Sequence, residues 1–227
     1  MIISVHIAKT AGNSFGRLLR HHYADRFMHD DEDWAGYVSP EAIARRVVNA
    51  RRMRQRRDEL VHQYDVIHGH FIADKYVGMF AVAKFIAFFR DPFQQAVSHY
   101  EFLRRIPHAV HPAIQEFHEA KMTIEDFVSW QATREPQAHF MGSLAVEDLE
   151  LVGLTEEFPR SLMLFNAMFG QSLGSEVFEN TNPARPEGGY SIDSALRKVI
   201  EMHRPKDIDI YRRATERFAQ QLRKQGI

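Results

Sequence analysis

The sequence contains no cysteine, which excludes disulfide bonds and thiolate chemistry and suits a reducing compartment. Long hydrophobic runs are also missing. The longest, Val77–Phe89, has about 13 residues and contains Lys84, whereas a membrane span needs roughly 20 apolar residues. Neither sign of charge predominates, since the sequence has 29 lysines and arginines and 30 aspartates and glutamates. Net charge therefore indicates no nucleic acid or membrane partner, and an anion-binding site must be local.

Two further absences narrow the class of protein. No basic segment precedes an apolar core at the N-terminus, so we expect no signal peptide and a cytoplasmic protein. No GxxxxGK[ST] motif occurs, which argues against a loop for nucleoside triphosphates. With 227 residues, 44% of them apolar, the chain can bury one good core, and we expect a single domain over residues 1–227.

Apolar periodicity predicts that strands alternate with helices. We expect strands within residues 2–8, 64–70, 83–90 and 149–153. Helices are expected after Gly12 and Asp91, over 39–63 with Ile43, Val47 and Ala50 on one side, and within 123–131, 155–170, 191–203 and 208–224. This alternation predicts an α/β fold with a central, mainly parallel sheet flanked by helices, and such sheets bind ligands at the carboxyl ends of their strands.

The segment Ala8–Ser14 connects the first predicted strand to the first predicted helix. Backbone N–H groups at the start of a helix, the positive end of its dipole, two hydroxyls and one ammonium group would converge there, which suits a phosphate or a sulfate. The contributing residues are Lys9, Thr10, Ala11, Gly12, Asn13 and Ser14. The alternative is that Lys9 is solvated and that Asn13 or Ser14 is an ordinary helix cap.

A second group of candidates follows the buried strand that ends at Arg90. Ser98 lies in the next helix, off the apolar stripe that begins at Phe93, and is therefore predicted to be free to contact a ligand. A guanidinium and a hydroxyl in these positions can hold a second phosphate. The alternative is a salt-bridged arginine and a surface serine.

The third group is the triplet His68–Gly69–His70 at the end of another predicted strand. Alternate residues of an extended segment point the same way, so both rings could face the cleft above the sheet. A histidine there is suited to remove a proton from a hydroxyl near neutral pH. A metal pair is the competing interpretation, but neither cysteine nor an HExxH-like spacing is present to complete it. The alternative for one of the two histidines is a structural role.

The segments "HIAKTAGNSF", "HGH" and "FRDPFQQAVSHY", in this order, resemble the sulfotransferases that use 3′-phosphoadenosine 5′-phosphosulfate (PAPS), and specifically the carbohydrate (heparan sulfate/uronyl) 2-O-sulfotransferase group. "VGLTEEFPRSLMLF" and "DIDIYRRATERF" are similar to later parts of the same pattern, so the resemblance spans most of the chain. Two features depart from it. Asn13 stands where serine or threonine is frequent, and the chain is shorter than the Golgi members and carries no segment like their membrane anchor.

The resemblance implies a P-loop-like three-layer fold and a PAPS-dependent enzyme that needs no metal and binds no nucleic acid. Lys9–Ser14 would hold the 5′-phosphosulfate, with Lys9 stabilising the leaving phosphate, and Arg90 and Ser98 would hold the 3′-phosphate. His68, supported by His70, would be the base that activates a hydroxyl acceptor, expected on a carbohydrate or glycoconjugate. Further residues are expected near an acidic acceptor or the adenosine: Arg104, Arg105, His108, His111 and the loop Asn182–Tyr190.

Two other functions compete with this interpretation. A P-loop kinase or nucleotide hydrolase could use Asp91 as a magnesium ligand at the end of its strand. A noncatalytic module could bind an anionic glycan or nucleic acid through the arginine-rich helix Arg45–Arg57. Such a module would need neither Lys9 nor the histidine pair, and its affinity would fall steeply with salt.

Overall fold

The computed structural model describes residues 1–107, 112–174 and 188–227. In these residues, five parallel strands form one sheet in the order β2-β3-β1-β4-β5. The strands are β1 (Ile2–Val5), β2 (Phe27–His29), β3 (Val66–Gly69), β4 (Lys84–Phe89) and β5 (Leu151–Leu154). The predicted α/β fold with a parallel central sheet is therefore confirmed.

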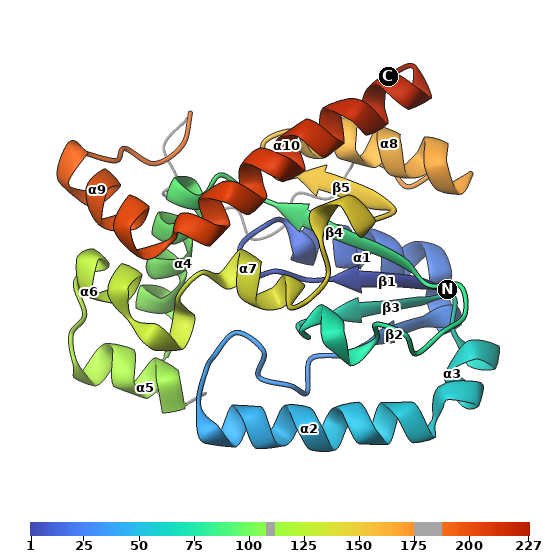
Figure 1. Cartoon of the computed structure of the whole chain (residues 1–227), viewed down its shortest axis with the longest axis horizontal. Helices are drawn as coiled ribbons and strands as arrows, with labels where there is room; N and C mark the ends of the chain where they lie inside the picture. The colour runs from blue at the N-terminus through green and yellow to red at the C-terminus, as the bar shows by residue number, and fades with distance from the viewer. Residues whose placement is uncertain (108–111, 175–187) are drawn as a thin grey trace.

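Helices cover both faces of this sheet, and Figure 1 shows α1 behind the strands and α7 and α10 in front of them. None of the helices in the described ranges is long and apolar enough to cross a membrane. The helices are α1 (Gly12–Tyr23), α2 (Pro40–Gln55), α3 (Arg57–Gln63), α4 (Pro92–Arg105), α5 (Pro112–Glu119), α6 (Ile124–Ser129), α7 (Pro136–Met141), α8 (Phe158–Phe169), α9 (Ser194–His203) and α10 (Pro205–Gln225).

The main hydrophobic core is built on the sheet and the helices that cover it. Ile3 of β1, Ile67 of β3 and Val152 of β5 are completely buried, as expected for parallel strands covered on both faces. A second apolar cluster joins α4, α5, α6 and α9. In Figure 1 this cluster lies beyond the carboxyl ends of the strands, so it forms one wall next to the ligand-binding edge of the sheet.

Helix starts follow the capping signals of the sequence. The hydroxyl of Ser39 accepts a hydrogen bond from the Ala42 amide before Pro40 begins α2. The carboxylate of Asp91 accepts from the amides of Phe93 and Gln94 at 3.0 and 2.9 Å. These local hydrogen bonds satisfy amides that the first turn of a helix leaves without a partner, which is why the sequence predicts them well.

The predicted helix over residues 39–63 is wrong in two respects. It is interrupted at Arg56, which separates α2 from α3. The expected apolar side is also not the buried one, because Ile43 and Val47 are 49% and 66% exposed. The buried residues of α2 are Ala42, Asn49 and Met53. On this side, the Asn49 side chain donates hydrogen bonds to the Glu32 carbonyl and to the Asp33 carboxylate in the loop after β2.

The short strand β2 and the turn that follows it were not predicted. Three residues are too few to show an apolar period, and β2 lies at the edge of the sheet. The Asp30 amide donates to the His68 carbonyl at 2.9 Å, and a Cβ atom at position 69 would overlap the Asp30 carbonyl. Glycine at position 69 therefore allows the chain after β2 to lie directly against the end of β3.

Candidate active site

The loops after β1 and β4 meet at a change of direction in the sheet. From β1 the chain passes beyond β3 to the edge strand β2, whereas from β4 it continues outward to β5. In open parallel sheets such a point leaves a crevice at the carboxyl ends of two neighbouring strands. Here that crevice is expected between the loop starting at His6 and Arg90, where the guanidinium Nη1 of Arg90 donates to the Lys9 carbonyl at 3.2 Å.

The loop between β1 and α1 has a conformation that suits an anion. Lys9 and Ala11 both have a φ of 65°, in the left-handed region, which costs about 1–3 kcal/mol at each residue and needs support from the surroundings. Outside helices and strands, none of the backbone–backbone hydrogen bonds of the described residues is donated by the amides of Lys9, Thr10 or Ala11. Successive amides in such a turn, next to the N-terminus of α1, form a concave donor surface.

The side chains of this loop differ in their availability. Thr10 is fully buried, and its hydroxyl donates to the Ile7 carbonyl at 2.9 Å. Ser14 is buried, whereas Asn13 is exposed. A Cβ atom at Gly12 would overlap the ring of His6, so glycine lets the start of α1 pack against that ring. In this loop the backbone amides and Lys9 are therefore better placed to bind an anion than the buried hydroxyl groups of Thr10 and Ser14 are.

Lys9 lies among other cations. Burial, and then the charges of Arg90 and Arg105, lower the pKa of Lys9 to about 8. Its Nζ atom is 4.2 Å from the centre of the Phe102 ring on α4. Because each of these positive charges disfavours the others, a bound anion would relieve their repulsion.

Arg90 is held at its backbone as well as by its side chain. Gln137 of α7 is completely buried, its Oε1 accepts from the Arg90 amide at 3.0 Å, and its Nε2 donates to the Arg90 carbonyl at 2.9 Å. Ser98 of α4 is only 6% exposed. It is about as buried as Arg90, which is 5% exposed.

His68 is the more enclosed histidine of the triplet. It is 3% exposed, and its Nδ1 atom lies 2.8 Å from the Ser4 hydroxyl. A Cβ atom at Gly16 would overlap its Nε2 side, so α1 packs directly on the ring. Burial, and then the charges of His70 and His29, lower the pKa of His68 to about 3.

His70 is more accessible, with 32% of its side chain exposed. Asp31 accepts a hydrogen bond from the His70 amide at 2.6 Å, and its Oδ1 lies 3.1 Å from Nδ1 of the ring. Its other oxygen lies 3.2 Å from Nε2 of His29. Burial acts to raise the pKa of Asp31, but the hydrogen bonds and charge of His70, with the charge of His29, hold it well below its usual value.

Asp31 therefore remains ionised and favours the His70 tautomer that carries its proton on Nδ1, which leaves Nε2 as an acceptor. On its other side the His70 ring packs on His6, with ring centres 3.8 Å apart. The pKa of His6 is well below its usual value, mainly because of burial and then because of the charges of His70 and His68. Of the histidines in contact here, His29 and His70 are the most exposed, with 43% and 32% of their side chains accessible.

The sequence did not identify Asp31, His29, His6 or Gln137 as parts of this site. The run "FMHDDED" over residues 27–33 was the available signal, since carboxylates that follow a strand lie at the ligand-binding edge. The adjacent Asp30 serves a different purpose. It lies 2.7 Å from the buried Nζ of Lys75 and accepts from the Tyr76 hydroxyl at 2.7 Å.

Residues expected near the acceptor and the adenosine are only partly described. His108 and His111 lie outside the described residues, as does Asn182–Glu187. Tyr190, at the end of the expected adenosine loop, is tied to α4, since Gln94 accepts from its amide at 2.8 Å and donates to its carbonyl at 3.0 Å. Arg104 pairs with Glu101 on the surface of α4.

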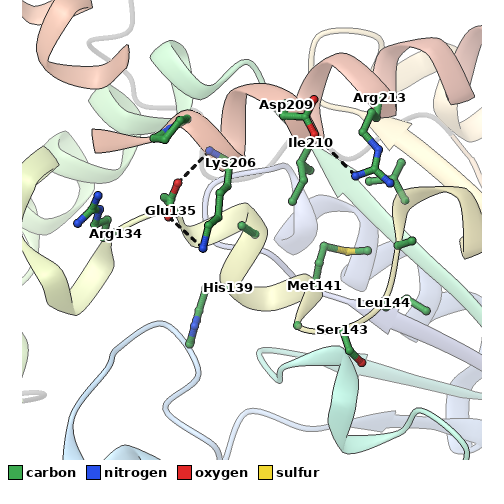
Figure 2. Close-up of a pocket in the computed structure, with 15 residues that line it drawn as sticks. Arg134, Glu135, His139, Met141, Ser143, Leu144, Lys206, Asp209, Ile210 and Arg213 are labelled. Carbon is green, nitrogen blue, oxygen red and sulfur yellow. Dashed lines mark hydrogen bonds and ion pairs between the residues drawn. The ribbon is translucent and has the colours of Figure 1, made fainter. Parts of the chain in front are cut away.

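A separate pocket of about 710 Å³ lies between α7 and α10 (Figure 2). None of the predicted site residues lines it. Glu135 lies opposite Lys206, and Asp209 opposite Arg213, so these four charges are compensated within the pocket. Within residues 1–107, 112–174 and 188–227, no group of three or more histidine, aspartate or glutamate side chains could hold a metal ion.

The molecule thus has an α/β fold with a candidate anion-binding loop and a histidine–aspartate pair at one edge of its sheet. Neither a family model nor a curated protein sequence matches this chain. It is similar to the crystal structure of a sulfotransferase from Alicyclobacillus acidocaldarius, with 15% sequence identity, a TM-score of 0.47 and coverage of 91% of this chain and 92% of that one. It is also similar to mouse sulfotransferase SULT7A1 complexed with PAP, with 14% identity, a TM-score of 0.39 and coverage of 88% and 62%.

Proposed function

We propose that this protein is a sulfotransferase that moves a sulfuryl group from PAPS to an acceptor hydroxyl. The observation that carries the proposal is the contact between Arg90 and the Lys9 carbonyl. It brings two motifs that are 81 residues apart to one crevice, where two anionic ends of one donor could be held. The sequence motifs carry the resemblance, and the amides of the loop together with Lys9 and Arg90 are the groups that would bind the anions.

In the proposed complex, the amides and side chains of Lys9–Ser14 bind the 5′-phosphosulfate. Arg90 binds the 3′-phosphate, and Ser98, which is buried to the same degree, is its second contact. Both anionic groups would lie next to the cations that lower the pKa of Lys9, which is the electrostatic reason to place them there.

For the base, we now prefer His70 to His68. His68 is buried under α1 and has a pKa of about 3, so it is poorly suited to take a proton from an acceptor in the crevice. His70 is partly exposed and is oriented by Asp31. His68 then acts as a packing residue that holds the end of β3 against α1.

In the reaction, the acceptor oxygen forms a bond to sulfur while the bond between sulfur and the bridging oxygen of the 5′-phosphate breaks. Nε2 of His70 takes the acceptor proton, and 3′-phosphoadenosine 5′-phosphate leaves. Lys9 and the loop amides stabilise the charge that develops on the bridging oxygen. Catalysis would come mainly from positioning and electrostatics, by analogy with phosphoryl transfer.

The first test is thermal unfolding with 3′-phosphoadenosine 5′-phosphate, and with ADP plus magnesium in parallel. A ligand at about 100 times its dissociation constant adds roughly 2.7 kcal/mol, which for a domain of this size raises the unfolding midpoint by about 5–11 °C. We expect this shift with the bisphosphate alone. A shift only with ADP and magnesium would instead support the kinase interpretation.

Arg90→Ala sharpens that test. It should weaken binding of the 3′-phosphorylated nucleotide while barely changing binding of adenosine 5′-phosphosulfate, which has no 3′-phosphate. Equal losses for both ligands would show that Arg90 supports the fold of the crevice and does not read the 3′-phosphate. Against the kinase alternative, the Asp91 carboxylate already caps α4, which leaves it less suited to bind magnesium.

For the acceptor, we propose a carbohydrate hydroxyl, on the basis of the resemblance of the HGH triplet. Uronic acid-containing oligosaccharides and neutral sugars can be compared as acceptors at a fixed PAPS concentration, with transfer measured from radiolabelled donor. Transfer to acidic sugars alone would support a role for the basic residues that follow Arg90, whereas transfer only to phenols or small alcohols would contradict the carbohydrate assignment.

A further inference from the structure

Arg204 is a completely buried arginine outside the crevice described above. It lies at the junction between α9 and α10, where it precedes Pro205. Burial, its main influence, lowers its pKa, and the charges of Asp207 and Glu135 act in the opposite direction. Because buried arginines are rare unless their charge and hydrogen bonds are used, its contacts indicate what it does.

The contacts of Arg204 lead towards the donor loop. Its Nη1 donates to Oε1 of Gln95 at 2.6 Å, and Gln95 is itself completely buried in α4. The amide Nε2 of Gln95 donates to the Ala8 carbonyl at 3.0 Å. One continuous chain of hydrogen bonds therefore joins the start of α10 to the residue before Lys9, across segments that Figure 1 shows side by side at the carboxyl end of the sheet.

Two neighbouring carbonyls of the loop thus each accept a hydrogen bond from a side chain. Gln95 holds the carbonyl of Ala8, and Arg90 holds that of Lys9. A trans peptide unit is planar, and its N–H points opposite to its C=O, so these two contacts direct the amides of Lys9 and Thr10 away from Gln95 and Arg90. Neither amide donates any of the backbone–backbone hydrogen bonds of the described residues outside helices and strands.

We infer that Arg204, acting through Gln95, is a positioning residue that sets the orientation of the anion-binding amides in the donor loop. The inference rests on the proposed function only for the identity of the ligand. The orientation of Gln95 follows from the same contacts, since an amide whose oxygen accepts from Arg204 must present its NH₂ group to the Ala8 carbonyl.

The test uses Gln95→Met, which keeps the size of the side chain and removes both hydrogen bonds without adding charge. Gln221→Met is the matched control, since Gln221 is also a buried glutamine that joins two backbone groups, the Val152 amide and the Glu150 carbonyl, at β5. Binding of 3′-phosphoadenosine 5′-phosphate is measured by calorimetry at a temperature where each variant is folded.

We expect Gln95→Met to weaken binding by about 3- to 10-fold, the change expected when one fixing hydrogen bond is lost. Gln221→Met should lower the unfolding midpoint and leave the affinity unchanged. Equal affinities of Gln95→Met and the original protein would overturn the inference. Failure of the original protein to bind the bisphosphate would instead contradict the proposed function.

A double substitution and the amide NMR signals of the loop provide two further tests. Arg204→Lys should weaken binding in the original protein but not in the Gln95→Met background, since the two residues act in series; additive losses would contradict this. In the unliganded protein, the amide NMR signals of Lys9 and Thr10 should shift in Gln95→Met and Arg204→Lys and stay in place in Gln221→Met. Unchanged signals in all three would also overturn the inference.

Discussion

Two neighbouring pairs of residues at the ends of β2 and β3 have the same chemistry and opposite environments. The buried pair is His68 and Asp30, which are 3% and 1% exposed, and whose backbones are joined by a hydrogen bond. The open pair is His70 and Asp31, with side chains 32% and 42% exposed. Each residue of the open pair is close in sequence to its buried counterpart. Residue type therefore does not distinguish a buried histidine from an accessible candidate base; the structure that covers it does.

His68 of the buried pair is covered by α1, which packs on its ring at Gly16. Asp30 forms an ion pair with Lys75 and accepts a hydrogen bond from the Tyr76 hydroxyl. The open pair lies just beyond the strand ends, where no helix of the described residues covers it completely. The comparison predicts that substitutions in the open pair change the reaction and that those in the buried pair change the stability.

The largest effect is expected for His70→Ala, which removes the proposed base and should lower kcat by about 100- to 10,000-fold. Its unfolding midpoint should change little because the side chain is partly exposed. Steady-state kinetics with saturating PAPS, together with thermal unfolding, measure both quantities. His68→Ala is the comparison variant, and if it alone abolished turnover while remaining folded, the assignment of the two histidines would have to be reversed.

The next effect concerns stability. Asp30→Asn removes one of the two buried carboxylates, Asp30 and Asp33, that pair with Lys75, and should destabilise the protein by about 1–3 kcal/mol. Asp31→Asn should cost far less, since the Asp31 side chain is 42% exposed and its partners are histidines. Urea unfolding of both variants measures the difference. Similar losses of stability would mean that the two aspartates are not separated in the way the structure describes.

A smaller effect on catalysis is expected for Asp31→Asn. An asparagine can still accept from Nδ1 of His70 but carries no charge, so a charge-assisted hydrogen bond of about 1.5–3 kcal/mol is weakened. If all of it acts in the transition state, kcat falls by roughly 10- to 150-fold. The Michaelis constant for PAPS should stay the same. A change in that constant with unchanged kcat would place Asp31 in donor binding instead.

The smallest effect is expected in the pH dependence of donor affinity, to which Lys9 should contribute and His68 should not. Burial lowers the pKa of both, to about 8 for Lys9 and about 3 for His68, and only the first lies in a convenient range. Lys9 loses its positive charge as the pH rises through about 8, so affinity for 3′-phosphoadenosine 5′-phosphate should fall above that pH, by at most about tenfold per pH unit.

Calorimetry between pH 6.5 and about 9.5 checks this, with Lys9→Arg as the control, because an arginine stays charged over the whole range. The decline should be absent from Lys9→Arg. An equally steep decline in that variant would assign the titration to another group. In addition, Lys9→Ala should lower turnover more than donor affinity, and a loss confined to affinity would contradict its proposed role at the leaving group.

Local signals in the sequence predicted much of the fold. The helices expected from residue 39, after Asp91 and from residue 123 are confirmed, because their starts depend on capping hydrogen bonds of Ser39, Asp91 and Thr123 within one turn of chain. The buried strand that ends before Arg90 is confirmed for a similar reason, since an apolar run covered on both faces needs no partner to be recognised. The exposure of Ile43 and Val47 was not predictable, because it depends on which side of α2 meets the loop after β2.

The candidate site shows the same division. The sequence by itself determined the parallel α/β class, the loop Ala8–Ser14 at the start of a helix, and Arg90 at the end of a strand, because these follow from residue periods and short-range hydrogen bonds. Only the tertiary structure decided that Asp31 orients His70, that α1 covers His68, and that Gln95 and Arg204 hold the loop. Those contacts join residues far apart in the chain, and no local pattern specifies which of two equivalent side chains a distant helix will bury.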